Sequence, residues 1–360
     1  MINVDTSILE IPSIINIKIT QEKGREYVAN QVIEKQTTLL KVFPYATAIF
    51  DSFKKRICAY CLCTHPSKSF STHCLSCDQV YFCSSVCAHT YLADHRTDIC
   101  ESLRKLATLK KVDKNMKSIG KLILMIYWQR QKEISSSSTA NEIKIKNNNE
   151  KEDKTATIEF DLVNQLESHY DAWSLDMKKD WSRLHTFLLK QLHQSNWILP
   201  HESDIDIMHL ASKIESNGFG IYLENKLDVL AGRAIYPLAS LFNHDCDFNC
   251  EVEQWTEEDL EEEKIKQQIT DDDGQEKEPI FTYPSVFKQA HGKFRQMMIR
   301  TVQDVQEGEA LTIGYIDTNI PVSSRRQRLL QDYYFTCQCQ RCIKESSQIA
   351  SFKKKKNKRK

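Results

Sequence analysis

Cysteine spacing is the feature that most constrains this chain. Eight of its thirteen cysteines lie between Cys58 and Cys100. They form the pattern Cys58-x2-Cys61, Cys74-x2-Cys77, Cys83-x3-Cys87 and His95-x4-Cys100, with Cys63 left over. Short C-x2-C turns hold two thiolates near one Zn²⁺, which takes four N or S ligands in a tetrahedron. The segment therefore predicts two zinc sites, although the spacing leaves open which pairs join, and His73 and His89 are rivals to His95.

Composition predicts a soluble intracellular protein of more than one domain. The 360 residues are 41% hydrophobic and 27% charged, which is enough to bury a sizeable core. The amino-terminal segment has no positively charged n-region, and Asp5 and Glu10 interrupt its apolar residues. We therefore do not expect it to be a secretory signal peptide. The longest apolar run, Leu122 to Trp128, is far shorter than the roughly 20 residues of a membrane span. Thirteen cysteines in a reducing compartment then favour metal sites over disulfides.

Near its end the chain carries three more thiolates within six residues, at Cys337, Cys339 and Cys342. Three ligands leave a tetrahedral zinc one short. The missing ligand must come from a distant segment, and Cys246 and Cys250 are the candidates. Closure through Cys246 would pin the end of the chain onto a segment 91 residues away. Metal binding would then bring distant side chains together at one site.

Four motifs carry a family resemblance. The strings YFCSSVC (81–87) and HRTDIC (95–100) resemble a MYND finger. Residues 243–249, NHDCDFN, resemble the NHxCxPN signature of SET-domain methyltransferases, 307–317 resemble their GEELTxxY element, and 333–342 their post-SET C-x-C-x2-C. In this order, over residues 15 to 345, the chain resembles the SET-and-MYND (SMYD) family of protein-lysine methyltransferases.

The resemblance implies an α+β fold: a SET-domain β-fold of short strands with an inserted MYND zinc finger, a helical SET insert and a post-SET zinc site. Because the chain stops soon after the post-SET cysteines, we also expect no helical carboxyl-terminal domain of the kind that longer family members have. The expected units are 1–57, the first part of the SET domain; 58–100, the finger; 101–215, the helical insert with a disordered linker at about 135–156; 216–318, the rest of the SET domain with an acidic loop at 256–278; 319–345, the post-SET segment; and 346–360, a basic tail.

Local patterns agree with these units. Alternating or continuous apolar runs predict strands at 15–19, 27–33, 37–42, 219–223, 250–255, 296–302 and 311–315, with a turn at Gly24. Apolar residues at helical spacing predict helices over 103–128 and 160–199. The polar stretch 135–155 and the acidic insert 256–278 are too hydrophilic to bury much surface.

The resemblance also assigns site residues. The interleaved MYND arrangement puts Cys58, Cys61, Cys83 and Cys87 on one zinc, and Cys74, Cys77, His95 and Cys100 on a second. Cys246 joins Cys337, Cys339 and Cys342 on a third. The implied S-adenosylmethionine site comprises Lys23, Gly24, Arg25, His169, Asn243, His244, Tyr315 and Phe335, with Tyr315 as the catalytic phenol and Phe219 and Tyr333 lining the channel for the substrate lysine.

Two substitutions depart from the family pattern. Glu26 stands where the first cofactor loop has its second glycine, and Phe248 stands where the signature has proline. The prediction is therefore a protein-lysine N-methyltransferase acting on histone or non-histone proteins, with a weak or inactive adaptor that binds proline-rich peptides as the alternative.

The other expectations concern partners and location. We expect a monomer in the nucleus, the cytoplasm or both, without membrane contact. Seven of the last eight residues are basic, which predicts nuclear import or a weak nucleic-acid contact; without them the chain has 42 basic and 49 acidic residues.

Overall fold

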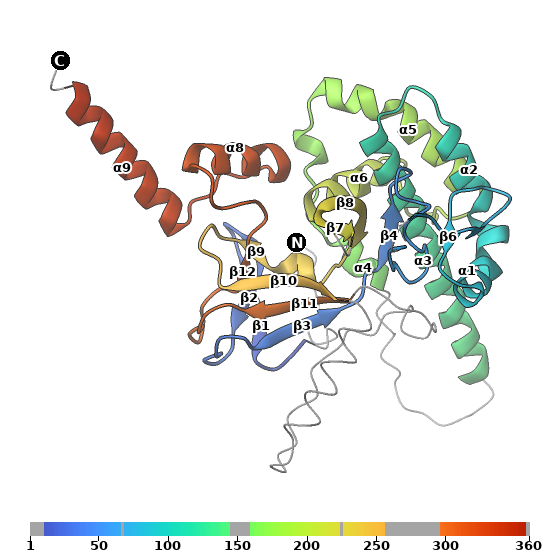
Figure 1. Cartoon of the computed structure of the whole chain (residues 1–360), viewed down its shortest axis with the longest axis horizontal. Coiled ribbons are helices and arrows are strands. Elements are labelled where there is room, and N and C mark those ends of the chain that lie inside the picture. The colour runs from blue at the N-terminus through green and yellow to red at the C-terminus, as the bar shows by residue number, and fades with distance from the viewer. Residues whose placement is uncertain (1–10, 66–67, 145–158, 224–225, 256–295, 358–360) are drawn as a thin grey trace, which may run out of the picture.

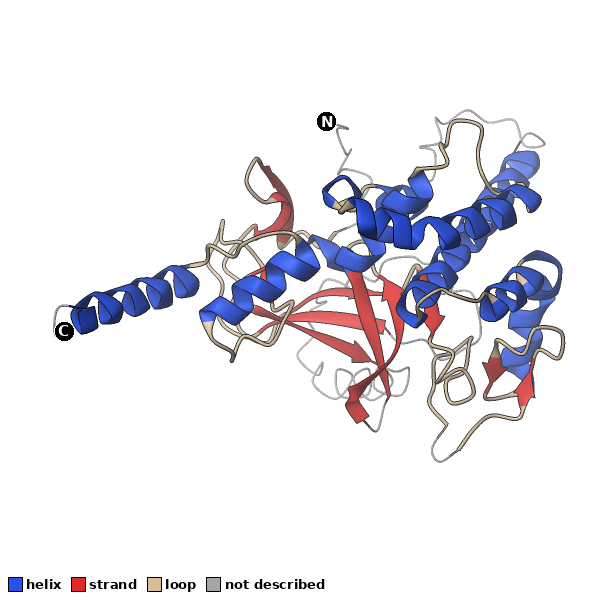
Figure 2. Ribbon diagram, turned by 90° about the horizontal axis from the view of Figure 1, so that it is seen from above, coloured by secondary structure: helices blue, strands red, loops and turns tan. Residues whose placement is uncertain are grey.

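The computed structural model describes residues 11–65, 68–144, 159–223, 226–255 and 296–357. Within them, short strands and helices are mixed, as the expected α+β class requires (Figure 1). Most strands gather in one part of the molecule and most helices in another, as the colours of Figure 2 show, and the finger (residues 58–100) lies at the end opposite α9 (Gln340–Asn357). In the described part of the chain, no helix combines the length and the apolar character needed to cross a bilayer.

The strands form small sheets. β1 (Ile15–Thr20) and β2 (Gly24–Ala29) pair antiparallel across a turn at Gly24, whose φ of +66° suits a residue without Cβ. The other sheets have the orders β10–β11–β3, β4–β8–β7, β12–β9 and β5–β6. Their bounds are β3 Thr38–Val42, β4 Ala46–Ile49, β5 Thr72–His73, β6 Tyr81–Phe82, β7 Gly218–Leu223, β8 Lys226–Ile235, β9 Asn243–His244, β10 Cys250–Trp255, β11 Gln296–Thr301 and β12 Thr312–Ile313. Strands β4, β5, β6, β8 and β9 were not predicted.

A short parallel pair joins two of the motifs. In the β9–β12 register, Asn243 lies opposite Thr312 and His244 opposite Ile313. The Asn249 side chain reinforces this pairing: its Oδ1 accepts a hydrogen bond from the Thr312 amide at 2.8 Å and its Nδ2 donates to the Ala310 carbonyl at 2.9 Å. Two segments about 70 residues apart are thereby fixed side by side.

The helix predicted over 103–128 is two helices, α2 (Cys100–Thr108) and α3 (Lys114–Lys144). The break has local causes. Leu109 is extended, Lys111 has a left-handed φ of 57°, and the Asp113 carboxylate caps α3 by accepting from the Asn115 amide at 2.6 Å. The break turns the chain between the finger and the long helix.

In three other places the observed helices differ from the sequence prediction. α3 continues to Lys144, through the first part of the linker expected to be disordered, because adding residues to an existing helix costs little free energy. The segment 160–199 divides into α4 (Glu159–Asn164), a 3-10 turn at Tyr170–Ala172 and α5 (Leu175–Gln194), which the Ser174 side chain caps. The basic tail is partly helical, because α9 extends to Asn357 and lysine is a good helix former. The acidic loop 256–278 lies outside the described residues.

Helix α3 is the centre of the helical half. Ile119, Leu122 and Ile126 on it are fully buried. The finger packs on the same helix, where Tyr91 and Trp128 meet edge to face with ring centroids 5.4 Å apart. α6 (Asp206–Asn217) also packs against α3 and ends at β7, and α8 (Val322–Tyr333) follows β12. The finger and the SET-like strands therefore share one helical support.

Candidate active site and metal centres

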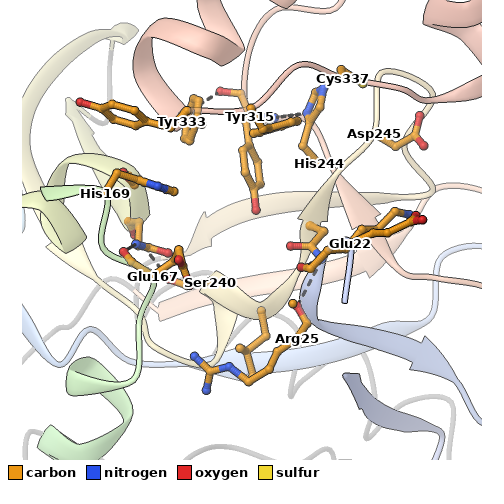
Figure 3. A pocket seen from close by; sticks show the side chains of 18 of the residues that line it. Glu22, Arg25, Glu167, His169, Ser240, His244, Asp245, Tyr315, Tyr333 and Cys337 are labelled. Atoms are coloured by element: carbon orange, nitrogen blue, oxygen red, sulfur yellow. Dashed lines mark hydrogen bonds between the residues drawn. The ribbon is translucent and has the colours of Figure 1, made fainter. Parts of the chain in front are cut away.

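A pocket of about 770 Å³ lies where the predicted motifs meet (Figure 3). Pockets of this size hold cofactor-sized molecules. Its lining includes Lys23, Gly24, Arg25, His169, Asn243, His244, Tyr315, Tyr333 and Phe335 from the predicted site. It also includes Cys337 and Cys339, so the post-SET segment forms part of the wall. The structure thus brings together all the residues predicted to bind the cofactor.

Asn243 holds the first loop in place. Its Nδ2 donates to the backbone carbonyl oxygens of Lys23 at 3.3 Å and Arg25 at 3.2 Å. These contacts cross more than 200 residues of sequence. Because the amide is engaged with the loop backbone, Asn243 positions the loop as well as lining the pocket.

Arg25 is tied to a third segment. Its Nη1 donates to Gln165 Oε1 at 3.2 Å, and its Nη2 donates to the Gln165 carbonyl oxygen. Burial lowers the Arg25 pKa, while the nearby Glu167 carboxylate acts in the opposite direction. We call this pair the Arg25–Gln165 strap; it links the first loop to the segment that carries His169.

Helix α6 supports that segment. The His169 amide donates to Ser212 Oγ at 2.9 Å, Ser168 Oγ lies 2.9 Å from His209 Nδ1, and the His169 ring stacks on Tyr334 with centroids 4.7 Å apart. Glu167 also lines the pocket. Gln165 was missed as a functional candidate because a single residue outside a motif gives no signal in sequence, and Tyr334 was missed although it lies within the post-SET motif.

Tyr315 lies at the pocket side of the β12 segment. Its phenol donates to the Phe242 carbonyl oxygen at 2.8 Å, and its ring centroid lies 4.8 Å from that of Tyr333. Tyr333 Oη in turn donates to the Tyr315 carbonyl oxygen at 3.3 Å. Burial raises the pKa of both phenols, so both remain protonated donors at neutral pH.

His244 links the pocket to the post-SET cysteines. Its Nδ1 accepts a hydrogen bond from the Tyr315 amide at 3.1 Å, and its Nε2 lies 3.4 Å from Cys246 Sγ. Burial lowers the His244 pKa to about 4, so the ring is neutral at pH 7. An acceptor at Nδ1 places the proton on Nε2, where it faces a sulfur.

The post-SET cluster comprises Cys246, Cys337, Cys339 and Cys342, whose sulfurs lie within 4.8 Å of one another. Cys246 Sγ is 3.5 Å from Cys342 Sγ and 3.9 Å from Cys337 Sγ. Zn–S bonds of about 2.3 Å in a tetrahedron require sulfur separations of about 3.8 Å. The rival Cys250 lies in β10, where its thiol donates to Asn249 Oδ1 at 3.4 Å. The donor set fits zinc.

Two arginines brace this cluster. Buried Arg325 donates to the Ile320 carbonyl oxygen and, through Nη2, to Glu345 Oε2, both at 2.6 Å. Arg341 donates to the Cys246 carbonyl oxygen and to Glu345 Oε1, both at 2.9 Å. Glu345 therefore connects both arginines around the thiolates.

The finger carries the two clusters expected from the MYND arrangement. Their ligand atoms also lie within 4.8 Å of one another, in the sets Cys58, Cys61, Cys83, Cys87 and Cys74, Cys77, His95, Cys100. His95 Nε2 is 3.4 Å from Cys77 Sγ, whereas His73 stacks on Tyr81 and His89 is exposed. Cys63 is outside both sets, although its thiol interacts with those of Cys58 and Cys61. Both donor sets suit zinc.

The two departures from the family pattern leave the pocket open. Glu26 is buried in β2 and is not among the residues that line the pocket. Phe248 packs on Gly314, where an added Cβ would lie 2.9 Å from its ring, so a glycine is needed immediately before Tyr315. Phe219, predicted for the lysine channel, also lies outside the lining and packs edge-on against Tyr236.

One buried polar atom indicates that the pocket takes a ligand. Ser216 Oγ is buried, has no hydrogen-bond partner in the described structure, and belongs to a residue of the lining. Buried hydroxyls are normally satisfied. The lining also includes the carboxylates of Glu22, Glu167 and Asp245, the cations of Lys23 and Arg25, and the Phe335 ring, so it suits a polar, charged ligand that carries an aromatic group.

Comparison with known proteins agrees with the motifs. No family model matches the chain. A SET and MYND domain-containing protein of Dictyostelium discoideum is 26% identical over 362 residues, covering 94% of this chain and 83% of that protein. Another from the same organism is 23% identical, covering 90% and 58%, and histone-lysine N-methyltransferase Smyd1 of Mus musculus is 24% identical, covering 93% and 57%. The chain thus spans less than two thirds of the length of two of these three relatives.

Among solved structures, the SET domain of LSMT bound to lysine and AdoHcy gives a TM-score of 0.36 at 12% identity, covering 92% of this chain and 55% of that one. A score at this level supports no conclusion about this chain. The sequence matches to these relatives extend over nearly the whole chain. They confirm that the chain resembles the SET-and-MYND family of protein-lysine methyltransferases.

Proposed function

We propose that this chain is an S-adenosylmethionine-dependent protein-lysine N-methyltransferase that acts on histone or non-histone proteins. The observation that carries the proposal is the single pocket in which the first loop, the His169 segment, the Asn243–His244 pair and the post-SET segment meet beside Tyr315 and Tyr333. Relatives named as histone-lysine methyltransferases support the reaction class.

Different groups of lining residues would bind different parts of S-adenosylmethionine. Lys23, Gly24 and Arg25 line the pocket on the loop that Asn243 holds, and Glu167 and His169 line it from the segment tied to α6. Phe335, whose ring centroid lies 6.1 Å from that of His244, offers an aromatic face for an adenine. When bound, S-adenosylmethionine supplies a methyl group on a positively charged sulfur.

The substrate lysine must arrive as a neutral amine, although its ordinary pKa is about 10.4. Tyr315 and Tyr333 favour that form, because a buried aromatic setting penalises the ammonium. Since the Tyr315 phenol is already held by the Phe242 carbonyl oxygen, its oxygen has a fixed position from which it accepts a hydrogen bond from the amine. We therefore assign Tyr315 the role of orienting the nucleophile, and positioning is the main source of rate.

Zinc supports this arrangement. We propose three zinc ions per chain, one at each cluster, with the third fixing Cys337 and Cys339 at the pocket wall. Metal content measured by atomic absorption should give about three equivalents. A content of two zinc equivalents would contradict the proposal that the post-SET cluster binds the third ion.

The test of function has two steps. Zinc-loaded protein is first titrated with S-adenosylmethionine in a calorimeter, where absence of binding would contradict the enzyme. Radiolabelled methyl transfer to a protein mixture is then compared between the wild type and Tyr315→Phe. We expect Tyr315→Phe to retain cofactor binding and to lose about 100-fold or more in rate, since a positioned phenol contributes on that scale.

A second function rests on exposed apolar side chains of the finger. Leu75 is 88% exposed and Val86 57% exposed, so both offer apolar surface that a partner could cover. We propose that the finger makes protein–protein contacts, with proline-rich peptides as the ligand class. Leu75→Ser should weaken binding of a labelled proline-rich peptide, whereas Leu175→Ser, an 85% exposed leucine on α5, should not.

A further inference from the structure

The turn between α2 and α3 carries a concentration of positive charge that the proposed site does not use. Residues 104–121 contain seven basic residues and one acidic residue, although the chain without its last eight residues is acidic by seven. The side chains of Lys110, Lys111 and Lys114 are exposed. We call these three residues the basic corner.

Neighbouring charges are already engaged. Lys117 Nζ donates to the Ala107 carbonyl oxygen at 3.2 Å, and buried Lys121 donates to the Ile49 carbonyl oxygen at 3.0 Å. The one acidic residue, Asp113, caps α3 by accepting from the amides of Asn115 and Met116. The basic corner therefore faces solvent with little local compensation.

A chain of neighbours connects the basic corner to the pocket. Asn115, which follows Lys114 in α3, accepts a hydrogen bond at its Oδ1 from Arg233 Nη2 at 2.6 Å. Arg233 on β8 lies close enough to Tyr333 for each to affect the other electrostatically. Tyr333 lines the pocket and packs against Tyr315. Asn115 and Arg233 thus connect the first turn of α3, which carries Lys114, to a residue that lines the pocket.

Two partly exposed side chains, Tyr222 and Leu230, form an apolar strip near Tyr333. Tyr222 is 36% exposed and Leu230 37% exposed. Both pack over Gly220, where an added Cβ would lie 2.6 Å from Leu230 Cδ1 and 2.8 Å from Tyr222 Cε2. The Tyr222 phenol also interacts electrostatically with Tyr333. A substrate peptide that crosses this strip would gain apolar contacts close to Tyr333.

We propose that the basic corner and Arg233 bind an acidic segment of the protein substrate close to the target lysine. This inference rests on the proposed function and names its substrate class. Glu215 opposes Arg233 electrostatically, so the three exposed lysines supply most of the attraction. The three exposed lysines lie within five residues of sequence, so their attractions for an acidic segment add together at this surface.

Peptide binding tests the surface without depending on catalysis. The probes are fluorescent peptides of equal length with one central lysine, flanked on one side by four glutamates or by four glutamines. By anisotropy, with the full-length zinc-loaded protein, we expect the glutamate peptide to bind about tenfold more tightly at 50 mM salt, an advantage that largely disappears at 300 mM. Equal affinities would overturn the proposal.

Charge reversal locates the effect. The variant Lys110→Glu, Lys111→Glu, Lys114→Glu should lose the preference for the glutamate peptide and bind the glutamine peptide unchanged. The control reverses three exposed lysines on other elements, Lys18→Glu, Lys35→Glu and Lys179→Glu, and should keep the preference. Equal losses in both variants would mean that only overall charge matters, and would also overturn it.

Methyl transfer separates the two proposals. If the glutamate peptide binds at the basic corner but no peptide is methylated by protein that binds S-adenosylmethionine, the proposed function fails and the docking surface remains. If methylation occurs with the same kcat/KM for both peptides, the enzyme stands and the acidic preference fails.

Discussion

The finger and the post-SET cluster use the same ligand chemistry over very different lengths of chain. The finger gathers eight ligands from 43 consecutive residues, whereas the post-SET cluster joins Cys246 to thiolates 91 to 96 residues away. The first arrangement organises a local module that packs on α3. The second brings Phe335, Cys337 and Cys339 to the pocket wall. The same kind of metal centre is therefore expected to stabilise a module in one place and to assemble a binding site in the other.

The largest expected effect follows from breaking the long-range cluster. Cys342→Ser removes a fully buried ligand, so the post-SET segment should no longer hold its place at the pocket. We expect metal content to fall from three equivalents to two and S-adenosylmethionine affinity to fall by about 100-fold or more. Cys250→Ser, at a buried cysteine outside the clusters, is the control and should retain both. Cofactor affinity close to wild type in Cys342→Ser would contradict the comparison.

Variants of the Arg25–Gln165 strap test whether cofactor binding also depends on hydrogen bonds between distant segments, in addition to the metal site. Arg25→Ala removes both hydrogen bonds to Gln165, and Gln165→Ala removes one. By calorimetry we expect about tenfold and about threefold weaker cofactor binding, since hydrogen bonds to a charged group contribute about 1.5–3 kcal/mol. A double-mutant cycle provides the control: if the strap carries the effect, the double variant should be no worse than Arg25→Ala. Additive losses would mean that Arg25 acts by direct contact alone.

A smaller effect is expected from the residue that connects the two arginines. Glu345→Gln keeps the side-chain shape but loses the ion pairs with Arg325 and Arg341. Because Glu345 is partly exposed, the cost should be about 1 kcal/mol, seen as faster release of one zinc to a chelator. Glu101→Gln, which breaks an exposed pair with Lys105 on α2, should leave zinc release unchanged. Unchanged release in Glu345→Gln would show that the thiolates need no such bracing.

Most metal ligands could be predicted because their spacing follows from coordination geometry. The resemblance paired them as the structure does, and it assigned the ligand role to Cys246 ahead of Cys250. Most strands predicted from alternating or continuous apolar residues also agree with the structure, as β10 at Cys250–Trp255 illustrates, whereas the strand predicted over 27–33 is β2 at Gly24–Ala29. These features depend on local sequence or on short, fixed distances.

What the sequence did not reveal depends on contacts between distant residues. Nothing around Gln165 indicates that Arg25 will bind it across 140 residues. The helix break at Leu109–Asp113 depended on a left-handed lysine and an aspartate cap inside an otherwise helical pattern. The channel role of Phe219 stays a prediction, because Phe219 lies beside Tyr236 and outside the pocket lining.

The smallest expected effect on the pocket comes from breaking the finger. Cys100→Ser removes one ligand of the second cluster and should lower metal content by one equivalent. The finger packs on α3 through Tyr91 and Trp128, so the variant should unfold at a temperature about 5 °C or more below wild type. No residue of the finger is among those that line the pocket, so its cofactor affinity should stay within about threefold of wild type. If cofactor affinity fell as far as in Cys342→Ser, the folding of the finger would affect the pocket through α3. The two metal regions would then differ in the length of chain they span but not in their role.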